Sequence, residues 1–281
     1  MNYVFFGTPR FAELVLGELL AAGLPPVAVV CNPDRPVGRR HLITPPPVKQ
    51  LVEQHDANIR VLQPEKLDEE FRRRLAELKP DFFVVAAYAR IIPQSVLDIA
   101  RLGTLGTHPS LLPKYRGASP IQSAILGGEK ETGVSIYLMD ANMDHGPVLA
   151  SATLPIRNDE NYAELEEELA HLAGRSLVTI IPDFFAGAAN PTEQNDATAT
   201  FTKKFATADG FISAEDLAAA ESGDTAQMER ISRMIRALNP EPGVWTLRDG
   251  KRMKLLAARI QDGALRLTLV QREGETAKRL T

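Results

Sequence analysis

Cysteine is almost absent from the sequence, which contains a single one, Cys31. A lone cysteine cannot form an internal disulfide, so disulfide-rich secreted scaffolds are excluded and a reducing compartment is favoured. No apolar run approaches the roughly 20 residues that a membrane-spanning helix needs. The N-terminal segment also lacks the basic flank and the small-residue cleavage site of a signal peptide. We therefore expect a cytoplasmic protein without a membrane partner.

The composition that remains is ordinary for a globular protein, with 44% hydrophobic and 24% charged residues. A chain of 281 residues can hold a medium domain and a small one. The first candidate motif is FFGTPRF at residues 5–11, a strand followed by a glycine turn and a helix start. It has no second or third glycine, so a dinucleotide fingerprint is not predicted there.

The first half of the chain alternates short apolar runs with helical patterns. The runs that predict strands are residues 3–6, 27–31, 82–87, 102–107 and 132–139. The predicted helices are residues 11–22, 48–55, 69–78, 120–126 and, as the longest, 161–185. Continuous apolar strands separated by helices are typical of a buried, mainly parallel sheet, that is, of a Rossmann-like α/β domain. Ligands bind such sheets beyond the carboxyl ends of the strands.

The amino-acid composition of the sequence changes after residue 185. Residues 186–204 are small, polar and interrupted by proline, which predicts a linker. A helix at residues 225–238 and three short strands then predict a small OB-like β-barrel module, whose strand region from 244 to 279 holds nine basic and four acidic residues. We expect a catalytic domain at 1–185, the linker at 186–204 and a C-terminal module at 205–281.

Two titratable residues follow strands of the predicted sheet. His108 comes after the apolar run 102–107, and Asp144 comes after the run 132–139, just before a glycine turn. Either residue alone is as consistent with a structural role. At the carboxyl ends of two strands they can meet across one crevice, where a carboxylate orients an imidazole base. No second histidine or cysteine stands at ligand spacing, so no metal site is predicted.

Residues 32–49 are predicted to form a long, cationic loop. The loop carries Arg35, Arg39, Arg40 and Lys49, with Asp34 as its only acid. Such a cluster of basic side chains can bind the phosphates of a nucleic acid. On charge alone, however, a solvated surface loop is the commoner explanation for such a cluster.

Two stretches carry a resemblance to a known family. HPSLLPKYRGASPIQSAI followed by TGVSIYLMDANMDHGPVL resembles the signature of formyltransferases that use 10-formyltetrahydrofolate. Within that superfamily, FFGTPRFA, NPDRPVGR, FTKKF and IRALNPEPGVWT are similar to the methionyl-tRNA formyltransferases. The resemblance implies a formyltransferase fold, a monomer, and transfer of a formyl group to the α-amine of methionyl initiator tRNA. A formyltransferase acting on an amino sugar is an alternative.

The resemblance also implies roles for single residues. His108 matches a donor to the developing oxyanion, and Asp144 matches an aspartate that orients it and relays protons. The residues implied in folate binding are Ala86, Tyr88, Ala89, Arg90, Ile91, Ile92, Ser110, Leu111, Leu112, Pro113, Tyr137 and Asp140. Those implied in tRNA binding are Arg35, Arg39, Arg40, Lys49, Lys203 and Lys204.

The sequence departs from the family's pattern at Gly106, where the family has an asparagine whose amide helps to hold the oxyanion. Losing one such donor typically costs about 10²–10³ in rate. Three explanations stay open: a neighbouring group such as Asn142 or an ordered water substitutes, the chain is a weak or silent binding relative, or the residue was changed to trap substrates. A second departure is the ending ETAKRLT, where relatives usually continue, so we expect the C-terminal module to be incomplete or differently closed.

Overall fold

The protein is described by a computed structural model that covers residues 1–280 apart from 39, 40, 56 and 57. Its contacts divide the chain into two compact units. The α/β unit comprises Met1–Arg116, Gly133–Leu154 and Glu166–Thr200. The C-terminal unit comprises Gly117–Thr132, Pro155–Leu165 and Phe201–Thr281. The domain boundaries expected at residues 185 and 204 stay a prediction.

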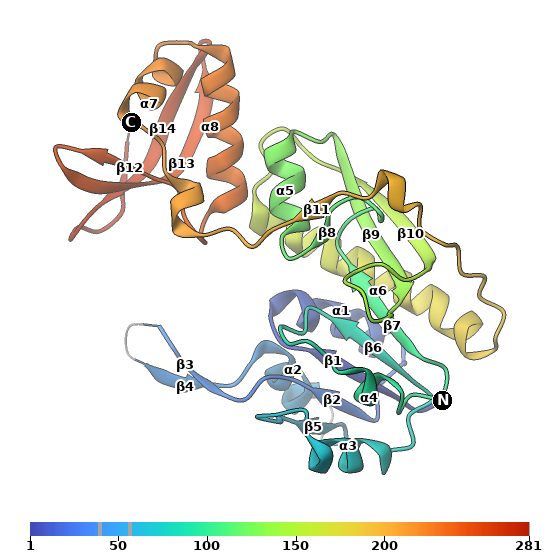
Figure 1. The fold of residues 1–281 in the computed structure, drawn as a ribbon. Coiled ribbons are helices and arrows are strands. Elements are labelled where there is room, and N and C mark those ends of the chain that lie inside the picture. Colours follow the sequence, from blue (N-terminus) through green and yellow to red (C-terminus); the bar gives the residue numbers. More distant parts are fainter. Residues whose placement is uncertain (39–40, 56–57, 281) are drawn as a thin grey trace. The chain divides into compact units, whose positions relative to one another are not determined.

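A seven-stranded sheet forms the centre of the α/β unit (Figure 1). In spatial order its strands are β10 (Val148–Pro155), β9 (Glu131–Leu138), β7 (Thr104–His108), β6 (Phe82–Ala86), β1 (Tyr3–Gly7), β2 (Ala28–Val30) and β5 (Arg60–Leu62). From β5 to β7 every pair is parallel, whereas β9 runs antiparallel to β7. The predicted Rossmann-like, mainly parallel sheet is thus confirmed.

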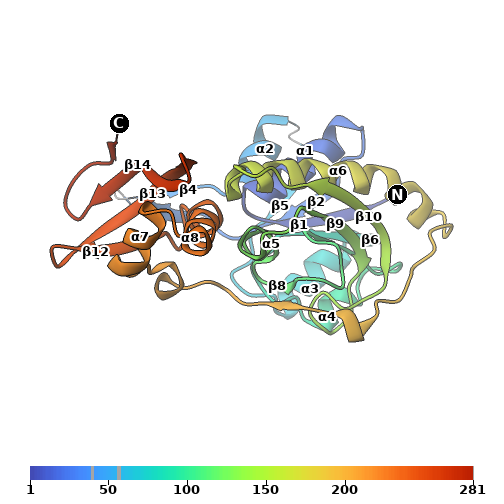
Figure 2. The same cartoon turned by 90° about the horizontal axis from the view of Figure 1, so that it is seen from above.

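Helices cover both faces of this sheet, which explains why its central strands are apolar throughout (Figure 2). The helices are α1 (Arg10–Ala21), α2 (Pro47–His55), α3 (Glu69–Ala76), α4 (Gln94–Leu97) and α6 (Tyr162–Phe185). Phe6 lies in a core cluster with Phe71 of α3. On the other face, Tyr3 stacks on Phe82, whose ring meets Phe184 of α6 edge-on. Alternate residues of neighbouring strands therefore pack on opposite helix layers.

The segment predicted as a long cationic loop is instead an antiparallel hairpin where it is described. Its strands are β3 (Arg35–Val37) and β4 (Leu42–Thr44), and Arg39 and Arg40 lie outside the described residues. Leu42 and Ile43 are 61% and 67% exposed, so this hairpin buries little apolar surface of its own. A hairpin of two three-residue strands without apolar alternation gives no periodic signal, which is why the sequence did not predict it.

The C-terminal unit combines helices with an antiparallel sheet. The helices are α5 (Pro120–Gly127), α7 (Ala214–Glu221) and α8 (Thr225–Leu238). The sheet follows chain order: β12 (Trp245–Arg248), β13 (Lys251–Gln261), β14 (Ala264–Arg272) and β15 (Lys278–Arg279). The unit also contains β11 (Phe201–Thr202) and η2 (Thr207–Gly210), while η1 (Asp196–Thr198) belongs to the α/β unit and β8 (Arg116–Gly117) has one residue in each. A small antiparallel β module at the C-terminal end is confirmed.

Candidate active site

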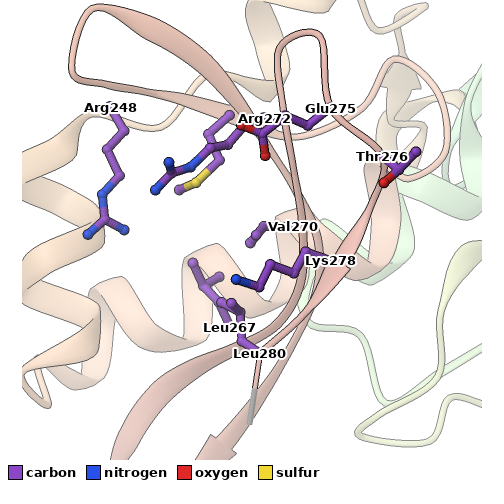
Figure 3. Close-up of a pocket in the computed structure, with 9 residues that line it drawn as sticks. Arg248, Leu267, Val270, Arg272, Glu275, Thr276, Lys278 and Leu280 are labelled. Atoms are coloured by element: carbon purple, nitrogen blue, oxygen red, sulfur yellow. The ribbon is translucent and has the colours of Figure 1, made fainter.

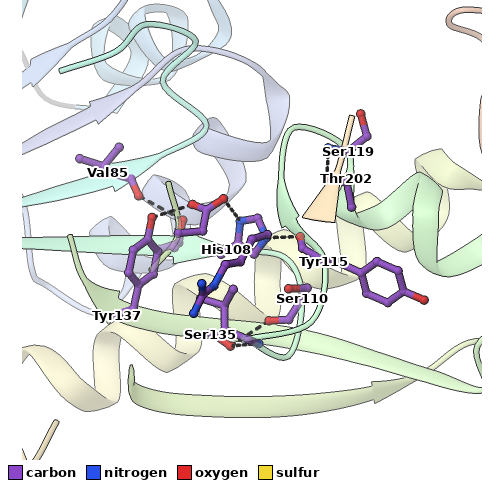
Figure 4. A network of polar contacts seen from close by, with 12 residues as sticks. Val85, His108, Ser110, Tyr115, Ser119, Ser135, Tyr137 and Thr202 are labelled. Carbon is purple, nitrogen blue, oxygen red and sulfur yellow. Dashed lines mark hydrogen bonds and ion pairs between the residues drawn. The ribbon is translucent and has the colours of Figure 1, made fainter. Parts of the chain in front are cut away.

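His108 is the last residue of β7, and its side chain is almost completely buried (Figure 4). Its Nε2 lies 2.8 Å from the backbone carbonyl of Tyr115, and its Nδ1 lies 3.6 Å from Asp144 Oδ2. A carbonyl can only accept, so Nε2 carries the proton of a neutral ring and Nδ1 then turns a lone pair toward the carboxylate. Protonating the imidazole places an N–H on each side. The imidazole and the carboxylate thus face each other beside the end of β7.

The structure brings His108 and Asp144 together by a route that differs from the predicted one. Because β9 runs antiparallel to β7, the carboxyl ends of these two strands do not share an edge of the sheet. Asp144 instead lies in residues 139–147, the return loop, which turns back so that Leu138 N donates to the carbonyl of Pro147 at 2.9 Å. A Cβ at Gly146 would collide with the Leu138 carbonyl, so this close approach requires glycine.

A hydrogen-bonded clamp that the sequence did not indicate holds the return loop. Gln194 Nε2 donates to the carbonyls of Asp144 and Gly146 at 3.0 and 2.7 Å. Its Oε1 accepts from Nε and Nη2 of Arg116 at 3.0 and 2.8 Å. The Arg116 guanidinium, only 4% exposed, also pairs with Asp196 at 2.8 Å and thereby lowers the pKa of that carboxyl. Gln194 belongs to the segment predicted as a linker, and no local pattern marks it as a contact residue.

A second histidine lies on the return loop. His145 Nδ1 is 2.7 Å from Asp140 Oδ2, and its Nε2 is 3.4 Å from Asp196. The hydrogen bond with Asp140 is the main reason that the pKa of His145 is raised above its usual value. Asp140, implied in folate binding, therefore already has a partner within the chain. The sequence pattern DHGP contains this histidine, but only the fold shows which carboxylates it meets.

Tyr137 of β9 lies against Gly106 and Asp144. Its hydroxyl donates to Asp144 Oδ1 at 2.8 Å (Figure 4). Burial first, and then the Asp144 charge, raise the pKa of Tyr137 well above its usual value, so the phenol stays protonated and remains a donor. Gly106, the cross-strand neighbour of Tyr137, is buried in β7.

The turn at residues 110–113 is fixed to β9 by one serine that the sequence did not single out. Ser135 Oγ donates to the carbonyl of Ser110 at 2.8 Å and accepts from Leu112 N at 3.0 Å (Figure 4). Ser110 Oγ in turn donates to the carbonyl of Lys114 at 2.6 Å. These bonds make the turn a rigid wall beside His108.

The segment after β6, residues 86–92, is the other wall implied in folate binding. Ala86 is paired with Thr107, so the segment begins next to His108. Tyr88 packs edge-on against Phe6 in the core, while Ile91 is 94% exposed. The side chains of this segment thus divide between core and solvent.

The residues implied in tRNA binding have several partners inside the chain. Lys49 Nζ lies 2.9 Å from Asp34 and 3.0 Å from Gln63, and the bond with Asp34 raises its pKa. Arg35 forms an exposed ion pair with Glu65 at 2.9 Å. In the C-terminal unit, Lys203 pairs with Asp209 at 2.6 Å, whereas Lys204 lines an open cavity of about 920 Å³.

Basic side chains also gather on the sheet of the C-terminal unit. Arg248, Arg272 and Lys278 line a cavity of about 170 Å³ between the strands (Figure 3). The basic excess of the strand region was the signal that could have found them. Across the described residues, no group of three His, Cys, Asp or Glu side chains could hold a metal ion. No helix of the described chain is long and apolar enough to cross a membrane.

Comparison with known proteins decides the family. A model described as formyl transferase matches residues 1–181, and one described as formyl transferase, C-terminal domain, matches residues 225–268. A methionyl-tRNA formyltransferase from Halorhodospira halophila is 40% identical over 256 residues, which cover 91% of this chain and 79% of that protein. The chain belongs to the methionyl-tRNA formyltransferase family. Another methionyl-tRNA formyltransferase, from Halalkalibacterium halodurans, is 41% identical over 256 residues, which cover 91% of this chain and 77% of that protein.

Solved structures share the fold of this family. The methionyl-tRNA formyltransferase from Clostridium thermocellum has a TM-score of 0.62 and 17% identity, covering 98% of this chain and 100% of that one. An N-formyltransferase from Helicobacter canadensis, solved with folinic acid and dTDP-3-aminofucose, has a TM-score of 0.65 and 17% identity. The match covers 93% of this chain and 89% of that one. At such identities the likeness is one of fold. By its family the chain is a formyltransferase, an enzyme class whose formyl donor is 10-formyltetrahydrofolate.

Proposed function

We propose that the site at His108 and Asp144 transfers the formyl group of 10-formyltetrahydrofolate to the α-amine of methionyl initiator tRNA. The observation that carries this assignment is the approach of the imidazole to the carboxylate at 3.6 Å, next to the end of β7. The α-amine attacks the formyl carbon, so a new C–N bond forms and negative charge develops on the formyl oxygen. The bond from carbon to N10 then breaks, and the proton lost by the amine is delivered to N10.

His108 and Asp144 supply the two functions that this chemistry needs. Asp144 accepts the amine's proton through the imidazole or through water and stabilises the ring when it is protonated, while His108 donates an N–H to the oxyanion. Both ring nitrogens already have partners within the chain, at Tyr115 and Asp144. His108 must therefore exchange its contact with the Tyr115 carbonyl for the formyl oxygen. The return loop and the turn at 110–113 hold the other residues of the site in place while His108 changes its hydrogen-bond partner.

The folate is proposed to lie along the segments that follow β6 and β7. Ala86, Tyr88, Ala89, Arg90, Ile91 and Ile92 would form one wall, and Ser110, Leu111, Leu112 and Pro113 the other, with Tyr137 and Asp140 between them. The parallel pairing of β6 with β7 supports this placement, because the carboxyl ends of adjacent parallel strands open on one edge. Tyr88 would contribute through its backbone, since its ring packs in the core.

A substitution at the carboxylate tests the assignment. Asp144→Asn keeps the shape of the side chain but removes the charge that the proton transfer requires. We expect kcat for formylation of methionyl-tRNA to fall about 10²–10⁴-fold, with tetrahydrofolate binding retained. Asp183→Asn, an exposed carboxylate of α6, is the matched control. A chain that binds tetrahydrofolate but transfers no formyl group to methionyl-tRNA would refute the proposal, as would transfer to an amino sugar alone.

The tRNA is proposed to bind through Arg35, Arg39, Arg40, Lys49, Lys203 and Lys204. Guanidinium and ammonium groups grip backbone phosphates and make binding salt-dependent. Arg39→Ala combined with Arg40→Ala should weaken tRNA binding and flatten its salt dependence by about 1–2 units of logarithmic slope. The pair Arg73→Ala and Arg74→Ala, exposed on α3, removes the same charge elsewhere. Equal affinity and slope for both double variants would exclude this role for Arg39 and Arg40.

A further inference from the structure

The residue at position 106 and the residue opposite it share one space. Gly106 of β7 pairs with Tyr137 of β9 across the antiparallel ladder. A Cβ built on Gly106 would lie 2.5 Å from Cε1, 2.6 Å from Cζ and 2.9 Å from the hydroxyl oxygen of Tyr137. These separations are far below van der Waals contact. No side chain can therefore stand at position 106 while the Tyr137 ring lies where it does.

The Tyr137 ring brings a polar group to the site as well as filling space. Its hydroxyl donates to Oδ1 of Asp144 at 2.8 Å, while Oδ2 of the same carboxylate faces His108 Nδ1. The carboxylate is thus held by β9 through the phenol, and its other oxygen faces the imidazole of β7. Tyr137 is 5% exposed, so this hydrogen bond is shielded from bulk solvent.

We propose that Tyr137 is a positioning residue of the transfer reaction: its hydroxyl sets the orientation of Asp144 toward His108, and its ring takes the space that a side chain at position 106 would fill. The proposal rests on the proposed function. It accounts for Gly106 within this chain without a neighbouring amide, because a side chain at 106 and the tyrosine ring at 137, as it lies here, would occupy the same space.

Tyr137→Phe is the first test, because phenylalanine keeps the ring and removes only the hydroxyl. We expect kcat to fall about 10-fold, as for the loss of a hydrogen bond to a charged group, with the KM for methionyl-tRNA unchanged. Asp144 and Asp140 after β9 act on this hydroxyl, and His108 faces Asp144 from β7. A fall in kcat without a change in the KM for methionyl-tRNA separates positioning of Asp144 from a general loss of structure. A variant with unchanged kcat overturns the proposal.

A double-substitution cycle tests the shared space. Gly106→Asn should lower activity, because its Cβ meets the tyrosine ring. Tyr137→Leu ends at Cδ and lacks all three colliding atoms, and alone it should lower activity by releasing Asp144. The two changes together should be more active than Gly106→Asn alone. Two results would show that positions 106 and 137 do not compete for one space. One is equal or higher activity of Gly106→Asn relative to the unsubstituted chain, and the other is a double variant no more active than Gly106→Asn.

Two controls separate misfolding and failure of the wider function from failure of this proposal. Each variant is compared with the unsubstituted chain in thermal unfolding and tetrahydrofolate binding, and Tyr137→Phe, which creates no clash, decides whether the hydroxyl matters. An unsubstituted chain that binds tetrahydrofolate but does not formylate methionyl-tRNA refutes the proposed function and this role with it. An active chain that is indifferent to Tyr137→Phe refutes this role alone.

Discussion

Replacing Gln194 by alanine should separate the stability of the return loop from the chemistry at Asp144. The substitution removes two hydrogen bonds to the carbonyls of Asp144 and Gly146 and two from the buried guanidinium of Arg116. The two bonds to neutral carbonyls contribute about 1 kcal/mol each. The two from the guanidinium together add about 1 kcal/mol more, because Asp196 continues to pair with Arg116. Together they predict a loss of about 3 kcal/mol in the free energy of unfolding.

The expected readouts of Gln194→Ala are a melting temperature lower by about 6 °C and a kcat about 10-fold lower, because the backbone of Asp144 is no longer fixed. Gln194→Glu refines the test. It keeps an acceptor for Arg116 but turns an oxygen toward the two carbonyls, so activity should fall while the Arg116 contact persists. Glu193→Ala, at the exposed neighbouring position, is the control. A melting temperature and kcat unchanged in Gln194→Ala would refute the clamp.

Two further predictions concern the return loop. Protonated His145 bridges Asp140 and Asp196, and its raised pKa means that its stabilisation is complete below about pH 6.5 and lost as the pH rises through the higher folded value. The melting temperatures of the chain and of His145→Gln should therefore differ most at about pH 5–6.5 and converge once the pH exceeds the raised pKa of His145; a pH-independent difference would contradict the bridge. Gly146→Ala should destabilise by about 1–3 kcal/mol in urea unfolding, because its Cβ displaces the Leu138 carbonyl; an unchanged midpoint would show that the close approach is not needed.

The elements that the sequence predicted well are those with a strong local period. Residues 225–238 place Met228, Ile231, Ile235 and Leu238 on one face, and they form α8 with the boundaries expected. The run at residues 3–6 forms β1, completely buried as a continuous apolar strand must be. Short elements were missed, among them α4 and β5, because four or three residues are too few to express a period.

The candidate site divides in the same way. His108 was placed at the end of a strand by the apolar run that precedes it, and the structure has it there. The path by which Asp144 reaches His108 could not be predicted, because a buried apolar run does not reveal the direction of its strand. The run that forms β9 would look the same if β9 were parallel to β7. Gln194 and Ser135 were missed because each contacts a carbonyl distant in sequence, and a polar residue in a loop carries no sign of such a partner.

The sequence by itself determined the alternation of strands and helices, the position of His108 after a strand, and the family motifs, because each of these depends on neighbours within a few residues. Only the tertiary structure decided how position 106 is filled. The amino-acid sequence shows a glycine without a side chain there, and the structure shows the Tyr137 ring in the space beside it. The physical reason is that cross-strand contacts depend on strand direction and register, and these are set by the packing of the whole sheet rather than by either strand alone.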